Sequence, residues 1–272
     1  GGDVLIKNTI LKSDHFPGCQ NMKLTPLIDG APNFRQVRGL PVYGVAIPTV
    51  KGLRTVLDVL GAGRGGRKVL WHNMREEPVI YINGAPYVVR ESTNPLANLE
   101  YTGIDRARVE QMEDRLKADI LAEAQVMHNT ILVADEDDNF NVINKWESVT
   151  EVDVQTPLEV YAELQADGYD VDYFRVPVTD EKAPKERDCD ELVRRCWNPT
   201  PGAAVVFNCQ MGRGRTTTGM IIGSILMLER LKRSPDGQEH IPAWFPSHDG
   251  GSRMLLPTSA EGEVKAVCFA CW

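Results

Sequence analysis

The sequence predicts an α/β fold with a mainly parallel sheet that is flanked by helices. Apolar segments of strand length alternate with segments of helical periodicity over most of the chain, which is typical of strand–helix–strand units. The chain has 272 residues, of which 42% are hydrophobic and 25% are charged. That balance is ordinary for a globular protein with a sizeable core. No apolar run reaches the roughly 20 residues that span a bilayer, so we expect no transmembrane segment.

The first hundred residues are expected to contain short strands, one helix and a hairpin. Residues 1–34 are punctuated by Pro and Gly and are predicted to be irregular. Apolar residues at helical spacing follow Pro48, and Gly61 is expected to end that helix. Asn83-Gly84 tolerates the positive φ angles of a tight turn and predicts a hairpin. The expected strands cover residues 42–47, 69–71, 79–82 and 87–90.

The later residues alternate helices with apolar strands. A long amphipathic helix is expected over 104–127, and the acidic run 135–138 is expected to be a turn. Thr156-Pro157 is a helix start signal, and Gly168 is expected to end that helix. The expected strands cover 130–134, 171–176 and 203–207, and the remaining helices cover 188–196 and 216–231.

These elements suggest a division of the chain into three parts. Residues 1–100 are expected to form an N-terminal segment and a lobe with the hairpin, packed on a core. Residues 101–235 are expected to form that core, which carries the reactive loop described below. Residues 236–272 are polar and rich in Pro and Gly, so we expect a loosely packed C-terminal tail.

Charge and cysteine content narrow the classes of partner. The formal net charge is −8, from 30 Lys and Arg against 38 Asp and Glu. We therefore expect no nucleic-acid partner and no strong adsorption to anionic membranes. The sequence has six cysteines and no Asn-x-Ser/Thr site with an allowed middle residue, which favours a cytoplasmic protein. The five histidines lack zinc-site spacing, so we expect neither a metal nor another cofactor.

The most informative motif is a cysteine that directly follows an apolar strand. Cys209 is separated by five residues from Arg215, and a helix follows. A loop of this length can curl so that its backbone N–H groups point inward, because Gly212 and Gly214 permit the required backbone angles. With the helix N-terminus and Arg215, such a loop would bind a tetrahedral dianion. The same positive field favours the thiolate of Cys209, which would be a nucleophile aimed at phosphorus.

Cleavage of a phosphate ester also needs an acid that protonates the leaving oxygen. The best candidate is Asp180, which follows the strand expected at 171–176 on a loop bracketed by Pro. Loops at the carboxyl ends of parallel strands are where such sheets carry their sites. Glu181 is the competing candidate.

The strand, Cys-x5-Arg-Thr loop and helix, with an acid loop upstream, resemble the protein tyrosine phosphatase superfamily. More narrowly, the chain is similar to the paladins and the phytase-like cysteine phosphatases of that superfamily. The loop alone marks the superfamily, whereas the segment 71–84 and the run Gln-Met-Gly-Arg-Gly-Arg point to the narrower family. The segments that carry the resemblance are residues 33–37, 44–49, 71–84, 98–104, 176–184 and 208–219.

The resemblance implies roles for individual residues. Cys209 would form a phosphocysteine, Arg215 would hold the phosphoryl oxygens, and Asp180 would act as general acid and then as base. Thr216 would hydrogen-bond the thiolate. The residues expected to bind the substrate are the loop residues Gln210, Met211, Gly212, Arg213 and Gly214, together with Arg35, Lys182 and Lys185.

The sequence departs from the usual pattern of the superfamily at two positions. Asn208 stands where most members have His before the cysteine, and Arg213 adds a charge inside the loop.

The number of cations expected around the phosphate site indicates the class of substrate. These five cations, more than a single phosphate needs, favour inositol polyphosphates as substrates: Arg35, Lys182, Lys185, Arg213 and Arg215. The alternatives are a phosphoinositide or phosphoprotein phosphatase, and a pseudophosphatase or signalling scaffold that binds phosphate without turnover. Because paladins are multi-repeat proteins, the resemblance also implies that this chain is one repeat of a longer protein.

Overall fold

The fold is taken from a computed structural model that describes residues 8–15, 24, 26–137, 139, 141–197 and 199–233. The tail expected over 236–272 lies outside the described residues. The helices are α1 (Val50–Val59), α2 (Arg106–Val126), α3 (Pro157–Ala166), α4 (Glu186–Cys196) and α5 (Gly214–Arg233), with one 3-10 turn, η1 (Glu151–Asp153). The strands are β1 (Thr9–Ser13), β2 (Arg35–Gln36), β3 (Val42–Val45), β4 (Val69–Arg75), β5 (Ile80–Ile82), β6 (Ala85–Glu91), β7 (Thr130–Glu136), β8 (Val142–Ser148), β9 (Val154–Gln155), β10 (Val171–Val178) and β11 (Ala204–Asn208).

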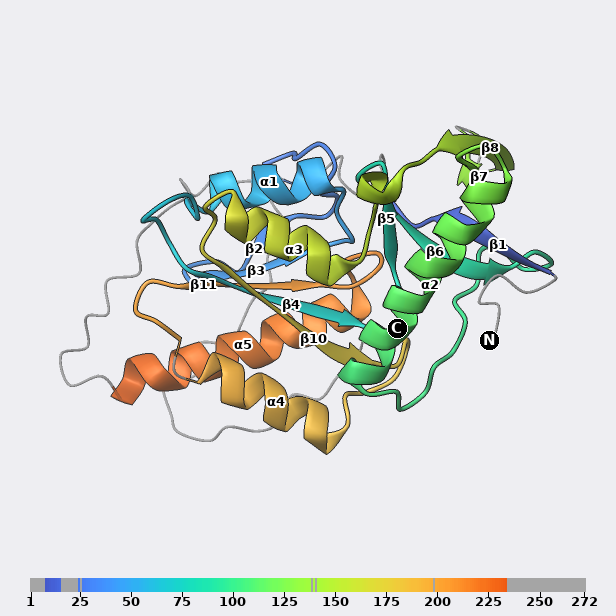
Figure 1. The fold of residues 1–272 in the computed structure, drawn as a ribbon. Helices are drawn as coiled ribbons and strands as arrows, with labels where there is room; N and C mark the ends of the chain where they lie inside the picture. The colour runs from blue at the N-terminus through green and yellow to red at the C-terminus, as the bar shows by residue number, and fades with distance from the viewer. Residues whose placement is uncertain are drawn as a thin grey trace.

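The first of two sheets, which we call the parallel sheet, is covered by helices on both faces. Its strand order is β10-β4-β11-β3-β2, and all neighbours are parallel except β2 and β3. Helices α1 and α3 cover one face, and α4 and α5 cover the other (Figure 1). In β11, Val206 packs toward α1 and α3, while Phe207 packs toward α4 and α5. Because both faces are buried, this strand is apolar without alternation.

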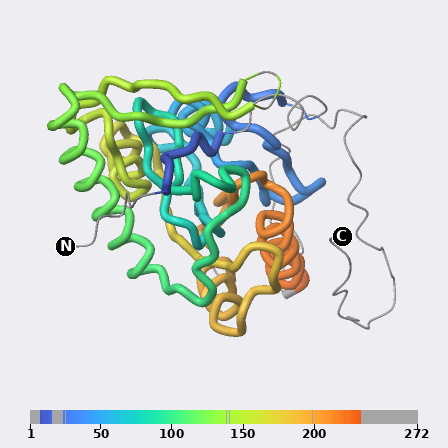
Figure 2. The backbone as a smooth tube through the Cα atoms, turned by 90° about the vertical axis from the view of Figure 1, so that its right-hand side faces the viewer, coloured from blue at the N-terminus to red at the C-terminus, as the bar shows by residue number. Residues whose placement is uncertain are grey.

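The second sheet, which we call the mixed sheet, lies beside the first and packs on α2. Its order is β8-β7-β1-β6-β5-β9, and its neighbours are antiparallel except β1 and β7. Leu116 and Ile120 of α2 pack against Leu11 and Ile131 of the sheet. Figure 2 views the molecule from the side where α2 and this sheet lie. None of the helices in the described part of the chain is long and apolar enough to cross a membrane.

The predicted fold class is confirmed, and the expected helices and strands are present with small shifts at their ends. Local signals account for this agreement. Thr49 caps α1 by accepting a hydrogen bond from the N–H of Gly52, and Thr156 caps α3 in a reciprocal pair with Glu159. Asn83 and Gly84 both have positive φ angles, as the hairpin between β5 and β6 requires.

The mixed sheet as a separate layer was not predicted. The expectation that residues 1–34 are irregular is wrong at β1, which pairs with β6 and β7. The expected acidic turn begins later than predicted, since β7 continues to Glu136. The division at residue 100 stays a prediction, but β3 and β4 from the first hundred residues pair with β11 in the parallel sheet. The two sheets therefore draw strands from both sides of that residue.

Candidate active site

The candidate site lies at the carboxyl ends of the parallel strands, where β11 passes into α5. We call residues 209–213 the nucleophile loop. Cys209 directly follows β11, and its side chain is buried, with 4% of its surface exposed. Gly212 has a φ of +69°, and a Cβ atom there would lie 2.6 Å from the backbone nitrogen of Ala46. Only glycine satisfies both the backbone angle and this close approach.

Residues on either side of β3 hold the nucleophile loop by hydrogen bonds to the carbonyl groups of the loop. The side-chain amide of Asn33 donates to the carbonyl oxygens of Met211 and Gly212, at 3.0 and 2.9 Å. The N–H of Ile47 donates to the carbonyl of Gln210 at 2.9 Å. Among hydrogen bonds between described residues, none is donated by the backbone N–H groups of residues 210–213. A loop with outward carbonyls and unpaired N–H groups is suited to bind an anion.

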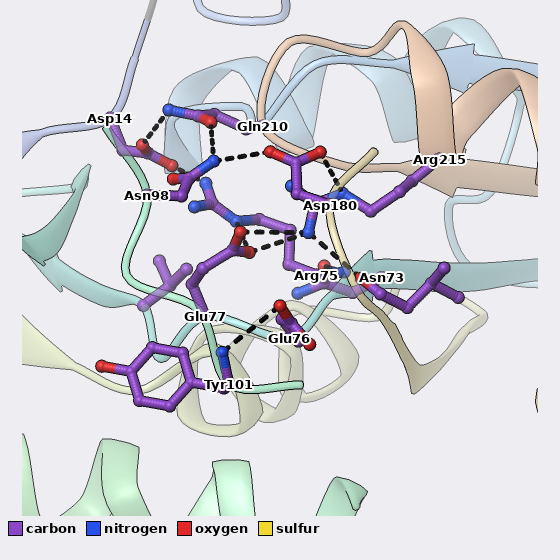
Figure 3. Close-up of polar contacts among 12 residues, drawn as sticks. Asp14, Asn73, Arg75, Glu76, Glu77, Asn98, Tyr101, Asp180, Gln210 and Arg215 are labelled. Carbon is purple, nitrogen blue, oxygen red and sulfur yellow. Dashed lines mark hydrogen bonds and ion pairs between the residues drawn. The ribbon is translucent and has the colours of Figure 1, made fainter. Parts of the chain in front are cut away.

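Arg215 lies in the first turn of α5 and is buried, with one part of its guanidinium fixed by a carboxylate. Its Nη1 donates to both oxygens of Glu77, at 3.1 and 2.9 Å, and lies 3.3 Å from the carbonyl oxygen of Val178 (Figure 3). Its Nε is buried and has no hydrogen-bond partner among the described residues. The guanidinium is therefore oriented by Glu77, while Nε makes no hydrogen bond among the described residues and has only an ion-pair contact with Asp180.

Glu77 is itself held between two arginines. Arg75 Nε lies 3.0 Å from Oε2 of Glu77, the oxygen that Nη1 of Arg215 also contacts at 2.9 Å. Burial alone would raise the pKa of Glu77, but Arg75 and Arg215 outweigh it and lower the pKa to about 2. Glu77 is thus ionised at neutral pH. Burial would lower the pKa of Arg215, but Glu77, Cys209 and Asp180 raise it, so the cation persists in the buried site.

Asp180 reaches this site from the loop after β10, residues 179–185, which we call the acid loop. Its Oδ1 lies 3.3 Å from Nε of Arg215, and its Oδ2 accepts a hydrogen bond of 2.7 Å from the amide of Asn98. The neighbouring Thr179 donates to Glu76 at 2.9 Å, which anchors the start of the loop. The competing Glu181 is exposed and has a φ of +54°. The structure therefore brings Asp180, and not Glu181, into contact with Arg215.

The remaining residues predicted for the site differ in their burial and in their contacts. Thr216 is buried and donates to the carbonyl of Val45 at 3.4 Å, beside the nucleophile loop. Arg35 in β2 donates to the hydroxyl of Thr217 at 3.0 Å. Burial lowers the pKa of Arg35, and a negative charge on Cys209 opposes that shift, so the two side chains are within electrostatic reach. The side chains of Lys182, Lys185 and Arg213 are exposed.

Several residues of the site were not singled out from the sequence. Glu77 and Asn98 orient Arg215 and Asp180, and Asp14 at the end of β1 binds the side chain of Gln210 at 2.9 Å. The signals for Glu77 were its place in the segment 71–84, which carries the family resemblance, and a run of charged residues at the end of a buried strand. Asn208, in the position of the usual histidine, accepts a hydrogen bond of 2.9 Å from Trp71. Within the described residues, no group of three or more His, Cys, Asp or Glu side chains is placed to hold a metal ion.

A helix-covered parallel sheet that ends in a Cys-x5-Arg loop, with a buried arginine and an adjacent acid, defines the class of cysteine phosphatases. A family model described as PTPlike_phytase, inositol hexakisphosphate, matches residues 72–227, which is more than half of the chain. The chain belongs to this family of phytases related to the protein tyrosine phosphatases.

Individual relatives agree with this assignment. Paladin of Gallus gallus is 30% identical over 244 residues, which cover 88% of this chain and 26% of the relative. The chain thus spans about a quarter of the length of the curated relatives it matches.

Two solved structures from Mitsuokella multacida share the fold. One is a PTP-like myo-inositol phosphatase in complex with myo-inositol-(1,3,4,5)-tetrakisphosphate, and the other a tandemly repeated protein tyrosine phosphatase-like phytase. Their TM-scores are 0.52 and 0.53, with 20% identity, and each match covers 85% of this chain and 38% of the other.

Proposed function

We propose that the chain hydrolyses phosphate monoesters through a phosphocysteine on Cys209, and that its substrates are inositol polyphosphates. The observation that carries the proposal is that Glu77 and Asp180 both contact the guanidinium of Arg215. Glu77 holds one end of its guanidinium by hydrogen bonds, while its Nε forms an ion pair of 3.3 Å with Asp180. An anion-binding group and a carboxyl group that can exchange protons are thus adjacent, next to a loop that begins with a buried cysteine.

The proposed reaction has two steps. In the first, the Cys209 thiolate attacks phosphorus, the ester P–O bond breaks, and Asp180 gives its proton to the leaving oxygen. In the second, Asp180 takes a proton from water as the water oxygen attacks phosphorus, the P–S bond breaks, and inorganic phosphate leaves. The loop N–H groups and Arg215 stabilise the charge that develops on the phosphoryl oxygens. The chemistry needs no metal, because these donors supply that stabilisation.

The substrate class rests on the family and on the surrounding cations. The family model is described by inositol hexakisphosphate, and one structural neighbour was solved with an inositol tetrakisphosphate. Arg35 lies near the nucleophile, and Arg213, Lys182 and Lys185 are exposed cations on the two loops that would contact further phosphates. Several cations beside one catalytic phosphate site favour a polyphosphorylated substrate over a singly phosphorylated one.

The test is phosphate release from inositol hexakisphosphate between about pH 4 and pH 8, the range in which a carboxyl acid and a thiolate act together. We expect release by the wild type, its loss in Cys209→Ser, and its retention in Cys189→Ser. Cys189 is the matched control because it is a free, half-buried cysteine on α4. Release that survives in Cys209→Ser would refute the mechanism. Release from phosphoinositide vesicles or phosphopeptides alone would refute the substrate class, and tight binding without turnover would indicate a phosphate-binding scaffold.

We also propose two features of the whole protein, its repeat organisation and its cellular location. The chain would be one repeat of a longer protein, since it covers 38% of a tandemly repeated structural neighbour and about a quarter of its curated relatives. The cytoplasmic location expected from the sequence would suit a thiolate enzyme, because Cys209 must remain reduced to react.

A further inference from the structure

We propose that Asn98 is a positioning residue that holds the general acid Asp180 beside Arg215 by a hydrogen bond to Oδ2. This inference deepens the proposed function and rests on it. It follows from a chain of hydrogen bonds that begins in the mixed sheet and ends at the acid loop (Figure 3).

The chain begins at a group that can only accept hydrogen bonds. Asp14 is completely buried and forms ion pairs with both Arg75 and Arg90, so it is a carboxylate. Gln210 contacts Asp14 Oδ1 at 2.9 Å, and its side chain must therefore present the NH₂ group there. Its amide oxygen then points away from Asp14, toward Asn98, 2.8 Å from Nδ2 of that residue.

A second constraint acts on Asn98 from the opposite side. Arg90 contacts Oδ1 of Asn98, and a guanidinium can only donate. Asn98 must therefore present its oxygen to Arg90 and its NH₂ group to Gln210. The acceptor Gln210 Oε1 and the donor Arg90 thus independently require the same orientation of the Asn98 amide.

The orientation of the Asn98 amide determines how Asn98 contacts Asp180. The NH₂ group of Asn98 has two hydrogens, and its nitrogen lies 2.8 Å from Gln210 Oε1 and 2.7 Å from Asp180 Oδ2. Oδ2 accepts this hydrogen bond, so Asn98 fixes that side of the Asp180 carboxyl group. The other oxygen, Oδ1, accepts a hydrogen bond of 3.2 Å from the N–H of Glu181 and lies 3.3 Å from Nε of Arg215. The carboxyl group is thereby held beside the place where Arg215 would bind the phosphoryl group, from which its proton would pass to the leaving oxygen.

The same chain connects the acid loop to the nucleophile loop. Gln210 follows the nucleophile, and its backbone carbonyl is fixed by the N–H of Ile47 at 2.9 Å. Its side chain holds Asn98, and Asn98 holds Asp180. The acid is therefore positioned relative to Cys209 by side chains, while its own loop is exposed.

The test compares two substrates of the same shape with different needs for an acid. Phenyl phosphate releases a basic phenolate and depends on proton donation, whereas 4-nitrophenyl phosphate releases a stable anion and depends on it far less. For Asn98→Leu we expect kcat to fall about tenfold on phenyl phosphate and less than about threefold on 4-nitrophenyl phosphate, a part of the roughly 10²–10⁴-fold that a general acid supplies. Asp180→Asn should show the same preference more strongly. Asn94→Leu is the matched control, since Asn94 is exposed on the same segment and contributes only backbone hydrogen bonds.

Equal losses on both substrates, or no loss, would overturn the proposal, because a general disturbance of the site does not depend on the leaving group. If Asn98→Leu does not fold, Asn98→Ser, which cannot reach both partners, replaces it. If the wild type cleaves neither of these substrates and releases no phosphate from inositol hexakisphosphate, the proposed function has failed. The contact is then tested by NMR of the Asn98 side-chain amide in the wild type and in Asp180→Ala. A shift of its resonances with faster solvent exchange supports the proposal, and unchanged resonances overturn it.

Discussion

Two neighbouring loops carry the nucleophile and the acid, and the fold holds them by different means. The nucleophile loop is fixed through its backbone, by Asn33 and Ile47 on its carbonyl groups and by the close approach of Gly212 to Ala46. The acid loop is exposed along most of its length and is held mainly through side chains, by Glu76 on Thr179 and Asn98 on Asp180.

The difference matches the tasks of the two loops. Donors that stabilise a transition state must be positioned before the reaction, since their reorganisation would add to the barrier. An acid must instead approach the leaving group after the substrate has entered, and side-chain contacts can be broken and remade during that step. Apart from the catalytic Asp180 itself, substitutions in the acid loop should therefore have far smaller effects than substitutions in the nucleophile loop.

The largest effect is expected for Gly212→Ala in the nucleophile loop. The added Cβ would meet the backbone nitrogen of Ala46 at 2.6 Å, at a φ of +69°. Strain and overpacking together should lower the free energy of unfolding by about 2–4 kcal/mol. Displacement of the loop should lower kcat by about 10²-fold or more. Chemical denaturation and kinetics test this, with Gly63→Ala as the control because its Cβ would point into open space. A fully active, stable Gly212→Ala would show that the loop is not held as rigidly as described.

An intermediate effect is expected for Glu77→Gln, which leaves the nucleophile loop intact but releases Arg215. Removal of one partner from a buried ion pair should lower the free energy of unfolding by about 3 kcal/mol at neutral pH. The pKa of Glu77 is lowered to about 2 in the folded protein, so its stabilisation is full above the usual glutamate range and is lost as the pH falls toward 2. The difference between wild type and variant should therefore disappear over that range.

Urea denaturation of both proteins at several pH values measures this difference. Glu163→Gln is the matched control, because Glu163 pairs with Arg54 at the surface and should contribute less than about 1 kcal/mol. A difference between wild type and Glu77→Gln that does not change with pH would contradict the ionised state assigned to Glu77.

The smallest effect is expected for Glu181→Gly in the acid loop. Glu181 has a φ of +54°, an angle that glycine adopts without strain. The relief of strain exceeds the added entropy of the unfolded chain only slightly, so the free energy of unfolding should rise by about 0.5 kcal/mol. Activity should stay within about threefold of the wild type, since Glu181 does not contact Arg215. A loss as large as that of Gly212→Ala would show that the acid loop is as rigid as its neighbour.

Much of the fold and the centre of the site could be predicted from the sequence. Only residues 209–213 separate the apolar strand β11 from α5, and Cys209 and Arg215 lie six positions apart, one directly after the strand and the other in the first turn of the helix. Strand β8, by contrast, is exposed along most of its length at the edge of the mixed sheet, so it shows no pattern of buried residues to indicate it. Strand β1 places Lys12 and Ser13 in the interior, which also hides the usual apolar signal.

The sequence by itself determined the parts of the protein that are encoded in contiguous residues. These are the strands, the capped helices, the hairpin and the loop that joins nucleophile to arginine, because each depends on local periodicity, backbone angles and capping. Only the tertiary structure decided the partners of that loop. Glu77 lies 138 positions before Arg215, and Asn98 lies 82 positions before Asp180. A single polar residue carries no periodic signal, and its partner is set by strand order and register, which arise only when the whole chain packs.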